Sequence, residues 1–266
     1  MNEAHFAHSM GFPFEYIFIF LFIGLIVIYV WAGLSTSARK HLKTWPLYRY
    51  VLWILGVFSA AAAVVGPLAA RAHSDFAVHM VGHLLLGMLA PLLFVLAAPM
   101  TLLLRTVSVA AARRISKLLR SWPVRIVHHP IVASFLNIGG LWVLYTTNLY
   151  EAMGENFLLH VLVHLHVFLA GYVFTASMIY IDPIAHRFSF IFRSIAFIFA
   201  LAGHQILSKY IYAYPPNGVA RTEAEAGGMI MYYGGDAIDL MIIFILCYQW
   251  FRETRPRSSI AVNQSG

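Results

Sequence analysis

The sequence has a single cysteine, Cys247, among its 266 residues. A disulfide within the chain is therefore impossible, and a metal site built from paired cysteines is excluded. Charged residues are also scarce, because they make up 11% of the chain, whereas a soluble domain carries about 25%. No polar segment is long enough to form a separate soluble domain. These absences predict a single membrane-embedded domain over residues 1–266.

Hydrophobic residues make up 61% of the chain and gather in long runs. A helix needs about 20 apolar residues to cross a bilayer, and the runs reach that length repeatedly. The sequence therefore predicts an all-α fold, a polytopic membrane helix bundle with seven transmembrane helices. The predicted spans lie near residues 12–33, 47–69, 76–98, 131–148, 156–180, 190–213 and 227–250. Pro91 and Pro99 interrupt the third span, so we expect a kink or an early end of that helix.

The basic residues gather on one side of the predicted bundle. Fifteen of the 18 lysines and arginines flank the first, third and fifth connections or follow the last span, and only Arg71, Lys209 and Arg221 lie on the other side. The positive-inside rule then places the N-terminus outside and the C-terminus in the cytoplasm. The net charge of +7 is explained by this topology and indicates no nucleic-acid partner.

The longest connection, residues 101–129, mixes arginines with leucine, isoleucine and valine. An amphipathic helix that lies on the anionic inner leaflet would have this composition. A basic loop that only sets the topology would have it as well. The sequence leaves both interpretations open.

Two histidine pairs lie within the predicted spans, near the outer surface. His79 and His83 in the third span, like His160 and His164 in the fifth, are four residues apart and share one face of a helix. Ionisable groups are costly in lipid, so they usually face the bundle interior and mark a functional path. A helical pair at this spacing can bind a metal ion, and these four histidines are the candidate metal ligands. The alternative is a hydrogen-bonded network that only stabilises the bundle.

Other polar and sulfur-bearing side chains are predicted at a similar depth. These candidate supporting residues are His204, Asp236, Asp239, Met80, Met229 and Met231. An aspartate there would orient a ligand or accept its proton, and methionine thioethers suit copper(I). Methionines in an apolar chain more often fill gaps in packing, so they do not identify copper by themselves.

Several short motifs occur in an order typical of one family. They are His-Met-Val-Gly-His at 79–83, the two Ala-Pro pairs within 90–99, His129-Pro130, the pair His160 and His164, Asp182-Pro183 followed by Arg187 and Ser189, and Gly-Gly-Met-Ile-Met at 227–231. Together they resemble the multi-span CtaG-type cytochrome c oxidase assembly factors. The likeness covers the third to the seventh span. The chain departs from the family pattern at Gly82 and Tyr232, where a polar residue and a tryptophan are common.

The resemblance implies a bacterial plasma-membrane protein that is needed to mature haem–copper oxidase. Its partners would be oxidase subunits within the lipid bilayer, and association between copies of the chain stays open. Copper would be the cargo, bound by the four candidate histidines and delivered on the outer side. We find no catalytic motif and expect no enzyme.

Two other functions fit the same residues. In a b-type cytochrome or quinone-linked oxidoreductase, one histidine from the third span and one from the fifth would be axial haem ligands, although the neighbours one turn away would crowd the porphyrin. A proton-coupled transporter would use the histidines and aspartates as a relay. A retinal protein is excluded, because no lysine lies within the seventh span to form a Schiff base.

Overall fold

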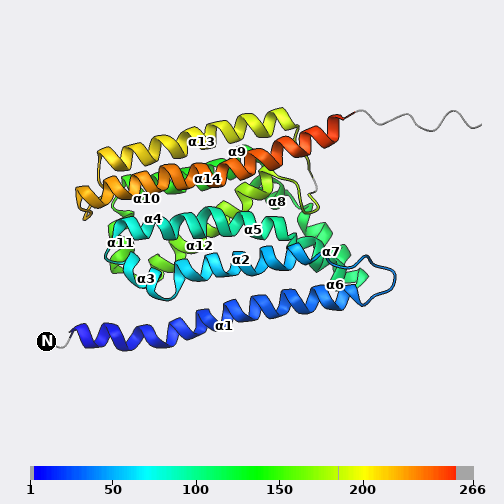
Figure 1. The fold of residues 1–266 in the computed structure, drawn as a ribbon, viewed down its shortest axis with the longest axis horizontal. Coiled ribbons are helices and arrows are strands. Elements are labelled where there is room, and N and C mark those ends of the chain that lie inside the picture. The colour runs from blue at the N-terminus through cyan, green and yellow to red at the C-terminus, as the bar shows by residue number, and fades with distance from the viewer. Residues whose placement is uncertain (1–2, 185, 256–266) are drawn as a thin grey trace, which may run out of the picture.

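The structure, a computed structural model, describes residues 3–184 and 186–255, with side chains described from residue 16 onward. Within these ranges all regular secondary structure is helical. The longest helices lie side by side along the long axis of the molecule (Figure 1). The prediction of an all-α bundle is confirmed.

The helical segments follow one another in a fixed order along the chain. They are α1 (Glu3–Ser37), α2 (Leu47–Val64), α3 (Pro67–Ala72), α4 (Phe76–Leu84), η1 (Leu85–Leu89), α5 (Ala90–Ala97), α6 (Pro99–Thr106), α7 (Val109–Leu119), α8 (Trp122–Val127), α9 (Pro130–Ser134), η2 (Phe135–Gly139), α10 (Gly140–Thr146), α11 (Leu149–Glu155), α12 (Phe157–Met178), α13 (Phe190–Ala213) and α14 (Arg221–Thr254). The segments η1 and η2 are π-helical turns within longer helices.

Within the described residues, six helices are long and apolar enough to cross a membrane. They cover Tyr16–Ser37, Leu47–Val64, Phe76–Thr106, Phe157–Met178, Phe190–Ala213 and Arg221–Thr254. The predicted span near 131–148 is present as Pro130–Thr146 and then bends by 77° into α11. This bent pair is a seventh span if it is counted as one. The chain is a multi-pass membrane protein, and its count of seven stays a prediction.

A predicted helix end is accurate where a turn directly follows the last apolar residue of the predicted span. α13 covers the predicted range 190–213. The predicted second span is too long, because Gly66 takes a positive φ of 84° and Pro67 starts the separate helix α3. The predicted seventh span is too short, because α14 begins at Arg221, which pairs with Glu225 at 3.0 Å on the exposed first turn.

The third span is interrupted, as predicted. Pro91 has no N–H to donate to the carbonyl of Gly87 one turn earlier, and the backbone just before it forms the π-turn η1. A second break follows at Ala98, whose left-handed φ of 55° separates α5 from α6. The hydroxyl of Tyr29 donates to the carbonyl oxygen of Ala97 at 2.6 Å, so α1 satisfies this broken helix end.

The basic connection 101–129 forms most of α6 and all of α7 and α8. Ser108 begins α7, because its hydroxyl accepts a hydrogen bond from the N–H of Ala111 at 3.4 Å. Val109 and Leu118 on α7 are exposed beside its arginines. The connection is thus divided into short helices, and both interpretations of it stay predictions.

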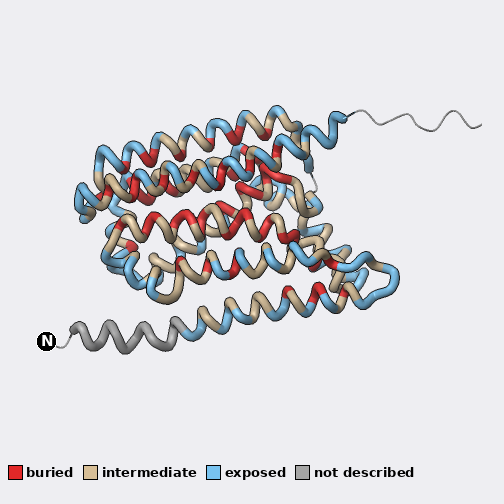
Figure 2. Tube along the Cα trace, in the orientation of Figure 1, coloured by how far each residue is buried: buried red, intermediate tan, exposed pale blue. Residues whose placement is uncertain are grey.

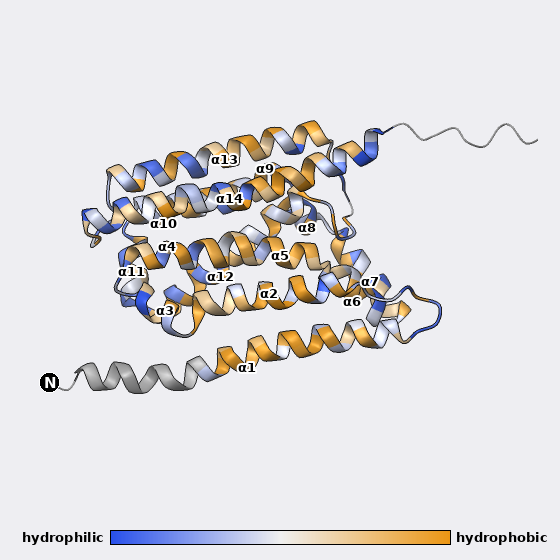
Figure 3. Ribbon diagram, in the orientation of Figure 1, coloured by the Kyte–Doolittle hydropathy of each residue, from blue (hydrophilic) through white to orange (hydrophobic). Residues whose placement is uncertain are grey.

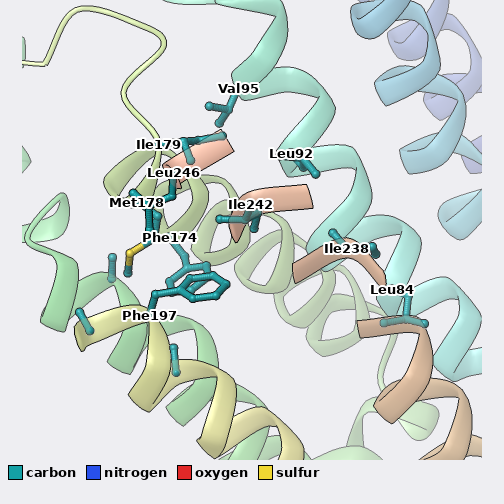
Figure 4. Close-up of a cluster of buried hydrophobic side chains, with 13 residues drawn as sticks. Leu84, Leu92, Val95, Phe174, Met178, Ile179, Phe197, Ile238, Ile242 and Leu246 are labelled. Atoms are coloured by element: carbon teal, nitrogen blue, oxygen red, sulfur yellow. The ribbon is translucent and has the colours of Figure 1, made fainter. Parts of the chain in front are cut away.

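The segment α4–η1–α5 lies at the centre of the bundle. In its most apolar window 61% of the residues are buried, against 17% for α1, and Figure 2 shows the buried residues along α4, α5 and α14. An apolar cluster that includes Leu92, Phe174, Phe197 and Ile242 joins α5 to α12, α13 and α14 (Figure 4). The histidine-bearing helix α4 is thus held by packing on several sides.

Two glycines bring α12 against the third span. A Cβ atom at Gly171 would overlap the carbonyl oxygen of Gly87, and one at Gly87 would lie 2.8 Å from Cγ1 of Val167. Small residues let membrane helices approach closely. The Gly87 carbonyl is also the one that Pro91 leaves without its helical donor.

The two ends of the bundle are named here by their residues. The histidine end contains α3, α11 and the first turns of α4 and α12, at the left in Figure 1. The arginine end contains α6, α7 and α8, at the right in the same view. Polar residues gather at both ends, and hydrophobic residues lie between them (Figure 3).

Candidate metal centre

Two helix caps set the height of the histidine pairs in the bundle. The carboxylate of Asp75 accepts hydrogen bonds from the N–H groups of Ala77 at 2.9 Å and Val78 at 3.1 Å, and so begins α4. Asn156 begins α12 in the same way, by accepting from the N–H of Leu159 at 3.1 Å. His79 and His160 each lie four residues beyond their cap. Both pairs therefore start about one turn inside the histidine end.

Four imidazoles form a chain of neighbouring rings, called the outer group: His73, His79, His160 and His164. The ring centres of His73 and His160 are 5.1 Å apart, those of His160 and His164 are 4.1 Å apart, and those of His164 and His79 are 6.2 Å apart. Nδ1 of His164 donates to the carbonyl oxygen of His160 at 2.9 Å. These rings belong to α4, α12 and the turn after α3, so three segments meet here.

The outer group lies along a polar cavity of about 240 Å³. Carboxylates of Asp75, Glu151 and Glu223 also line it, as do the aromatic ring of Tyr150 and the sulfur-bearing side chain of Met153. Glu223 on α14 accepts a hydrogen bond from the N–H of Phe76 at 3.1 Å, which joins the seventh predicted span to the start of α4. Three carboxylates and four imidazoles therefore line the same cavity.

A second place, called the inner pair, is formed by His83 on α4 and His204 on α13. Their ring centres are 6.3 Å apart and their planes differ by 23°. Both are buried, with 7% and 2% of their surface exposed. Nε2 of His83 and both ring nitrogens of His204 make no hydrogen bond within the described residues. Buried polar atoms are usually paired, so these three nitrogens are free to bind something else.

Glycines make room for the rings of the inner pair. A Cβ atom at Gly235 would lie 2.6 Å from Cε1 of His204, and one at Gly87 would lie 3.3 Å from Cε1 of His83. A larger residue at either position would displace the imidazole. Tyr145 links the two places, because its hydroxyl is hydrogen-bonded to Nε2 of His79 at 3.2 Å and its ring centre is 6.3 Å from that of His83.

The four predicted ligands therefore fall into two places. His79 meets α10 and α12, whereas His83, one turn further along α4, meets α13. Among the described residues, no three His, Cys, Asp or Glu side chains are grouped closely enough to hold a metal ion. A metal role for the four histidines stays a prediction.

The region from within α1 to the last turn of α14 matches one family. A sequence profile described as cytochrome c oxidase caa3 assembly factor (Caa3_CtaG) covers residues 27–253. The chain belongs to this family. Its matched region includes both histidine places and the arginine end.

Two mycobacterial proteins are similar to the chain at 25–29% identity. An uncharacterized protein of Mycobacterium leprae is 29% identical over 170 residues, which are 61% of this chain and 26% of that protein. An uncharacterized protein of Mycobacterium bovis is 25% identical over 258 residues, which are 89% of this chain and 39% of that protein. The chain thus spans less than half of the length of these relatives. No solved structure matches it.

The six predicted supporting residues do not lie together in this family member, and their surroundings differ from one residue to the next. Asp236 is hydrogen-bonded to the amide of Gln205, and no described histidine is among its partners. Met80 and Met231 are buried in the apolar cluster that includes Tyr145. The remaining predicted residues are His204 in the inner pair, Asp239, which is buried, and Met229, which is 49% exposed.

Sequence reasoning missed His73 and Tyr145. His73 lies in the turn after α3, outside every predicted span, so a search for ionisable groups in lipid passes over it. Tyr145 reads as an ordinary aromatic residue of a membrane helix. Its buried position against His79 and His83 follows from the rotation of α10, which the sequence pattern does not specify.

Proposed function

We propose that this assembly factor binds copper at its histidine end and passes it to a haem–copper oxidase subunit. The proposal is supported by the inner pair, in which three buried ring nitrogens have no hydrogen-bond partner within the described residues. The ring centres of its two histidines are 6.3 Å apart. Two metal–nitrogen bonds of about 2 Å, with about 1.1 Å from each nitrogen to its ring centre, separate two rings by about 6 Å in a linear arrangement. Linear coordination by two imidazoles suits copper(I).

The outer group would act as the entry site for the same cargo. Its cavity carries three carboxylates, Asp75, Glu151 and Glu223, which raise the local concentration of cations. Its rings continue to His79, which shares Tyr145 with His83. Copper would therefore meet imidazole ligands along the whole way from the cavity to the inner pair.

We also propose that the histidine end faces the outside of a bacterial plasma membrane. The basic residues of the connections, among them Arg113 and Arg125, lie at the arginine end, as the positive-inside rule requires for the cytoplasmic side. Cysteines introduced at Glu151 and Arg113, in a Cys247→Ser background, test this. An impermeant thiol reagent should label position 151 in intact cells and position 113 only after lysis. The reverse labelling would overturn the orientation.

The haem alternative is less well supported. A haem between His79 and His164 would have to enter a space beside two other rings. The ring centre of Tyr150 is 5.0 Å from that of His79, and the ring centre of His160 is 4.1 Å from that of His164. The cavity of about 240 Å³ is also below the roughly 300–1,000 Å³ of ordinary cofactor pockets. A proton relay through Asp236 is less well supported as well, since that carboxylate is directed at Gln205.

The deciding experiment measures copper per folded protein and oxidase activity in the same cells. We expect the full-length protein, loaded with copper(I) and passed over a competing chelator, to retain the metal. His83→Ala combined with His204→Ala should lose it and lower oxidase activity. His166→Ala is the matched control, because His166 is exposed and its ring is hydrogen-bonded to the carbonyl oxygen of Leu136 at 3.2 Å. Retention of copper by the double variant would reject the inner pair as the copper site.

A further inference from the structure

The arginine end has two adjoining cavities that the copper proposal does not use. One has a volume of about 80 Å³ and the other about 500 Å³, and Arg125, His186 and Phe188 line both. Arg187 and His129 also line the larger cavity, and His128 also lines the smaller one. Two arginines and three histidines thus surround a joint space between α8 and the segment before α13.

The cationic side chains around this space have no acidic partner. The ion pair between Arg221 and Glu225, at the histidine end, is the only one among the described residues. Asp182 borders the smaller cavity, but it accepts hydrogen bonds from the N–H and hydroxyl of Thr101, at 2.7 Å and 2.6 Å. Its charge is therefore directed at the start of α6. Arg125 and Arg187 are both exposed and both line the larger cavity, so an anion in that cavity would meet two positive charges.

Two further donors or acceptors are unpaired in the same place. Nδ1 of His128 and Nδ1 of His129 are buried and make no hydrogen bond within the described residues. Burial lowers the pKa of His128, so the permanent positive charge comes from Arg125 and Arg187. Arginine forms paired hydrogen bonds with phosphate oxygens. Two arginines that line one cavity therefore suit a phosphate group.

The smaller cavity adds an apolar wall to this cationic rim. Val95, Leu119, Val124 and Ile179 line it, at the ends of two membrane helices and beneath α7. A soluble anion would use only the rim. A lipid would use both parts, with its phosphate at the arginines and the first methylene groups of an acyl chain against the aliphatic side chains.

We propose that the arginine end holds one anionic phospholipid, with its phosphate between Arg125 and Arg187 and an acyl chain entering the smaller cavity. Basic pockets beside transmembrane helices bind such headgroups in other membrane proteins. The bound lipid joins α8 to the segment that precedes α13, because each of them carries one of the two arginines. The site is independent of copper at the opposite end.

Lipid retention by the full-length protein tests the site. Protein purified in mild detergent is titrated with phosphatidylglycerol, phosphatidylcholine or inorganic phosphate, and bound molecules are counted by native mass spectrometry. We expect one phosphatidylglycerol to bind at least about tenfold more tightly than phosphatidylcholine, because charge-assisted bonds favour the anionic lipid. Equal binding of the two lipids would overturn the proposal. Binding of inorganic phosphate as tight as that of phosphatidylglycerol would replace the lipid with a soluble anion.

Variants of matched charge locate the lipid. Arg125→Gln with Arg187→Gln should lose the preference for phosphatidylglycerol. Arg113→Gln with Arg252→Gln should keep it, because all four arginines are exposed but Arg113 and Arg252 lie outside both cavities. Ala176→Leu, which fills the smaller cavity from α12, provides a second test if the first variant does not fold. Unchanged lipid binding in both the arginine and the Ala176 variants would reject this location.

Discussion

The two ends of this bundle differ in their nitrogen-bearing side chains, which are imidazoles at one end and guanidinium groups at the other. At the histidine end, imidazoles are buried within the helices, and Asp75, Glu151 and Glu223 line the cavity beside them. At the arginine end, guanidinium groups such as Arg125 and Arg187 border cavities and have no acidic partner within the described residues. Ligand nitrogens beside carboxylates favour a metal cation, and permanent cations beside an apolar wall favour an anionic lipid. The two proposals thus place a copper site and a lipid site at opposite ends of one helical bundle.

The largest effect is expected from variants at opposite ends, which should impair copper binding and lipid binding separately. His83→Ala should lower copper affinity by more than the roughly 10–100-fold that loss of a supporting group causes, and should leave phosphatidylglycerol binding unchanged. Arg125→Gln with Arg187→Gln should do the reverse. Both properties are measured on the same preparations, by chelator competition and native mass spectrometry. If each variant impaired both properties, the two ends would be coupled and the comparison would fail.

A smaller effect is expected from the close contact between α12 and the third span in the middle of the bundle. Gly171→Ala places a Cβ atom against the carbonyl oxygen of Gly87, so it should destabilise the fold by about 1–3 kcal/mol, as overpacking does. Gly24→Ala is the matched control, because a Cβ atom there has no neighbour within 4 Å. Unfolding in a denaturing detergent would measure both. Equal stability of the two variants would show that α12 and the third span do not need this close approach.

A local effect is expected at the arginine end from Asp182→Ala. This change removes the acceptor for the N–H groups of Met100, at 3.1 Å, and Thr101, at 2.7 Å, at the start of α6. Loss of such bonds costs about 1–3 kcal/mol, so amide hydrogen exchange in α6 should accelerate while copper affinity stays the same. Glu253→Ala, at an exposed position in the last turn of α14, is the control. Unchanged exchange in α6 would contradict the capping role of Asp182.

The smallest effect is expected from Asp236→Asn. Its carboxylate is hydrogen-bonded to Gln205 instead of a histidine, and an asparagine retains an oxygen that accepts this bond. Copper affinity should change by much less than the roughly 10–100-fold expected of a group that supports a metal ligand. Chelator competition checks this, with Gln205→Ala as the companion variant. A loss comparable to that of His83→Ala would return Asp236 to the metal site.

Hydropathy and spacing predicted the helices because both depend on local sequence. Apolar runs defined α13 to the residue, and Pro91 predicted the interruption of the third span, although not that it takes the form of a π-turn. The i, i+4 spacing correctly placed His79 and His83 one turn apart on α4. These features need no knowledge of neighbouring helices.

The division of the histidines between two places could not be predicted. Which helix faces His83 depends on how α13 is rotated and on the room that Gly235 leaves for His204. His73 joins the outer group through its ring contact with His160 on α12, and it lies in the turn after the short helix α3 that follows the break at Gly66. Contacts of this kind are set by packing between distant segments, for which a single sequence gives no pattern.

X-ray absorption of the copper(I)-loaded protein tests the central proposal most directly. If the inner pair of His83 and His204 holds the ion, the spectrum should show two imidazole nitrogens at about 2 Å, and His204→Ala should remove or change this signal. Protein that folds but holds no copper(I) would contradict the proposal. So would a spectrum dominated by sulfur from the methionines that remains the same in His204→Ala.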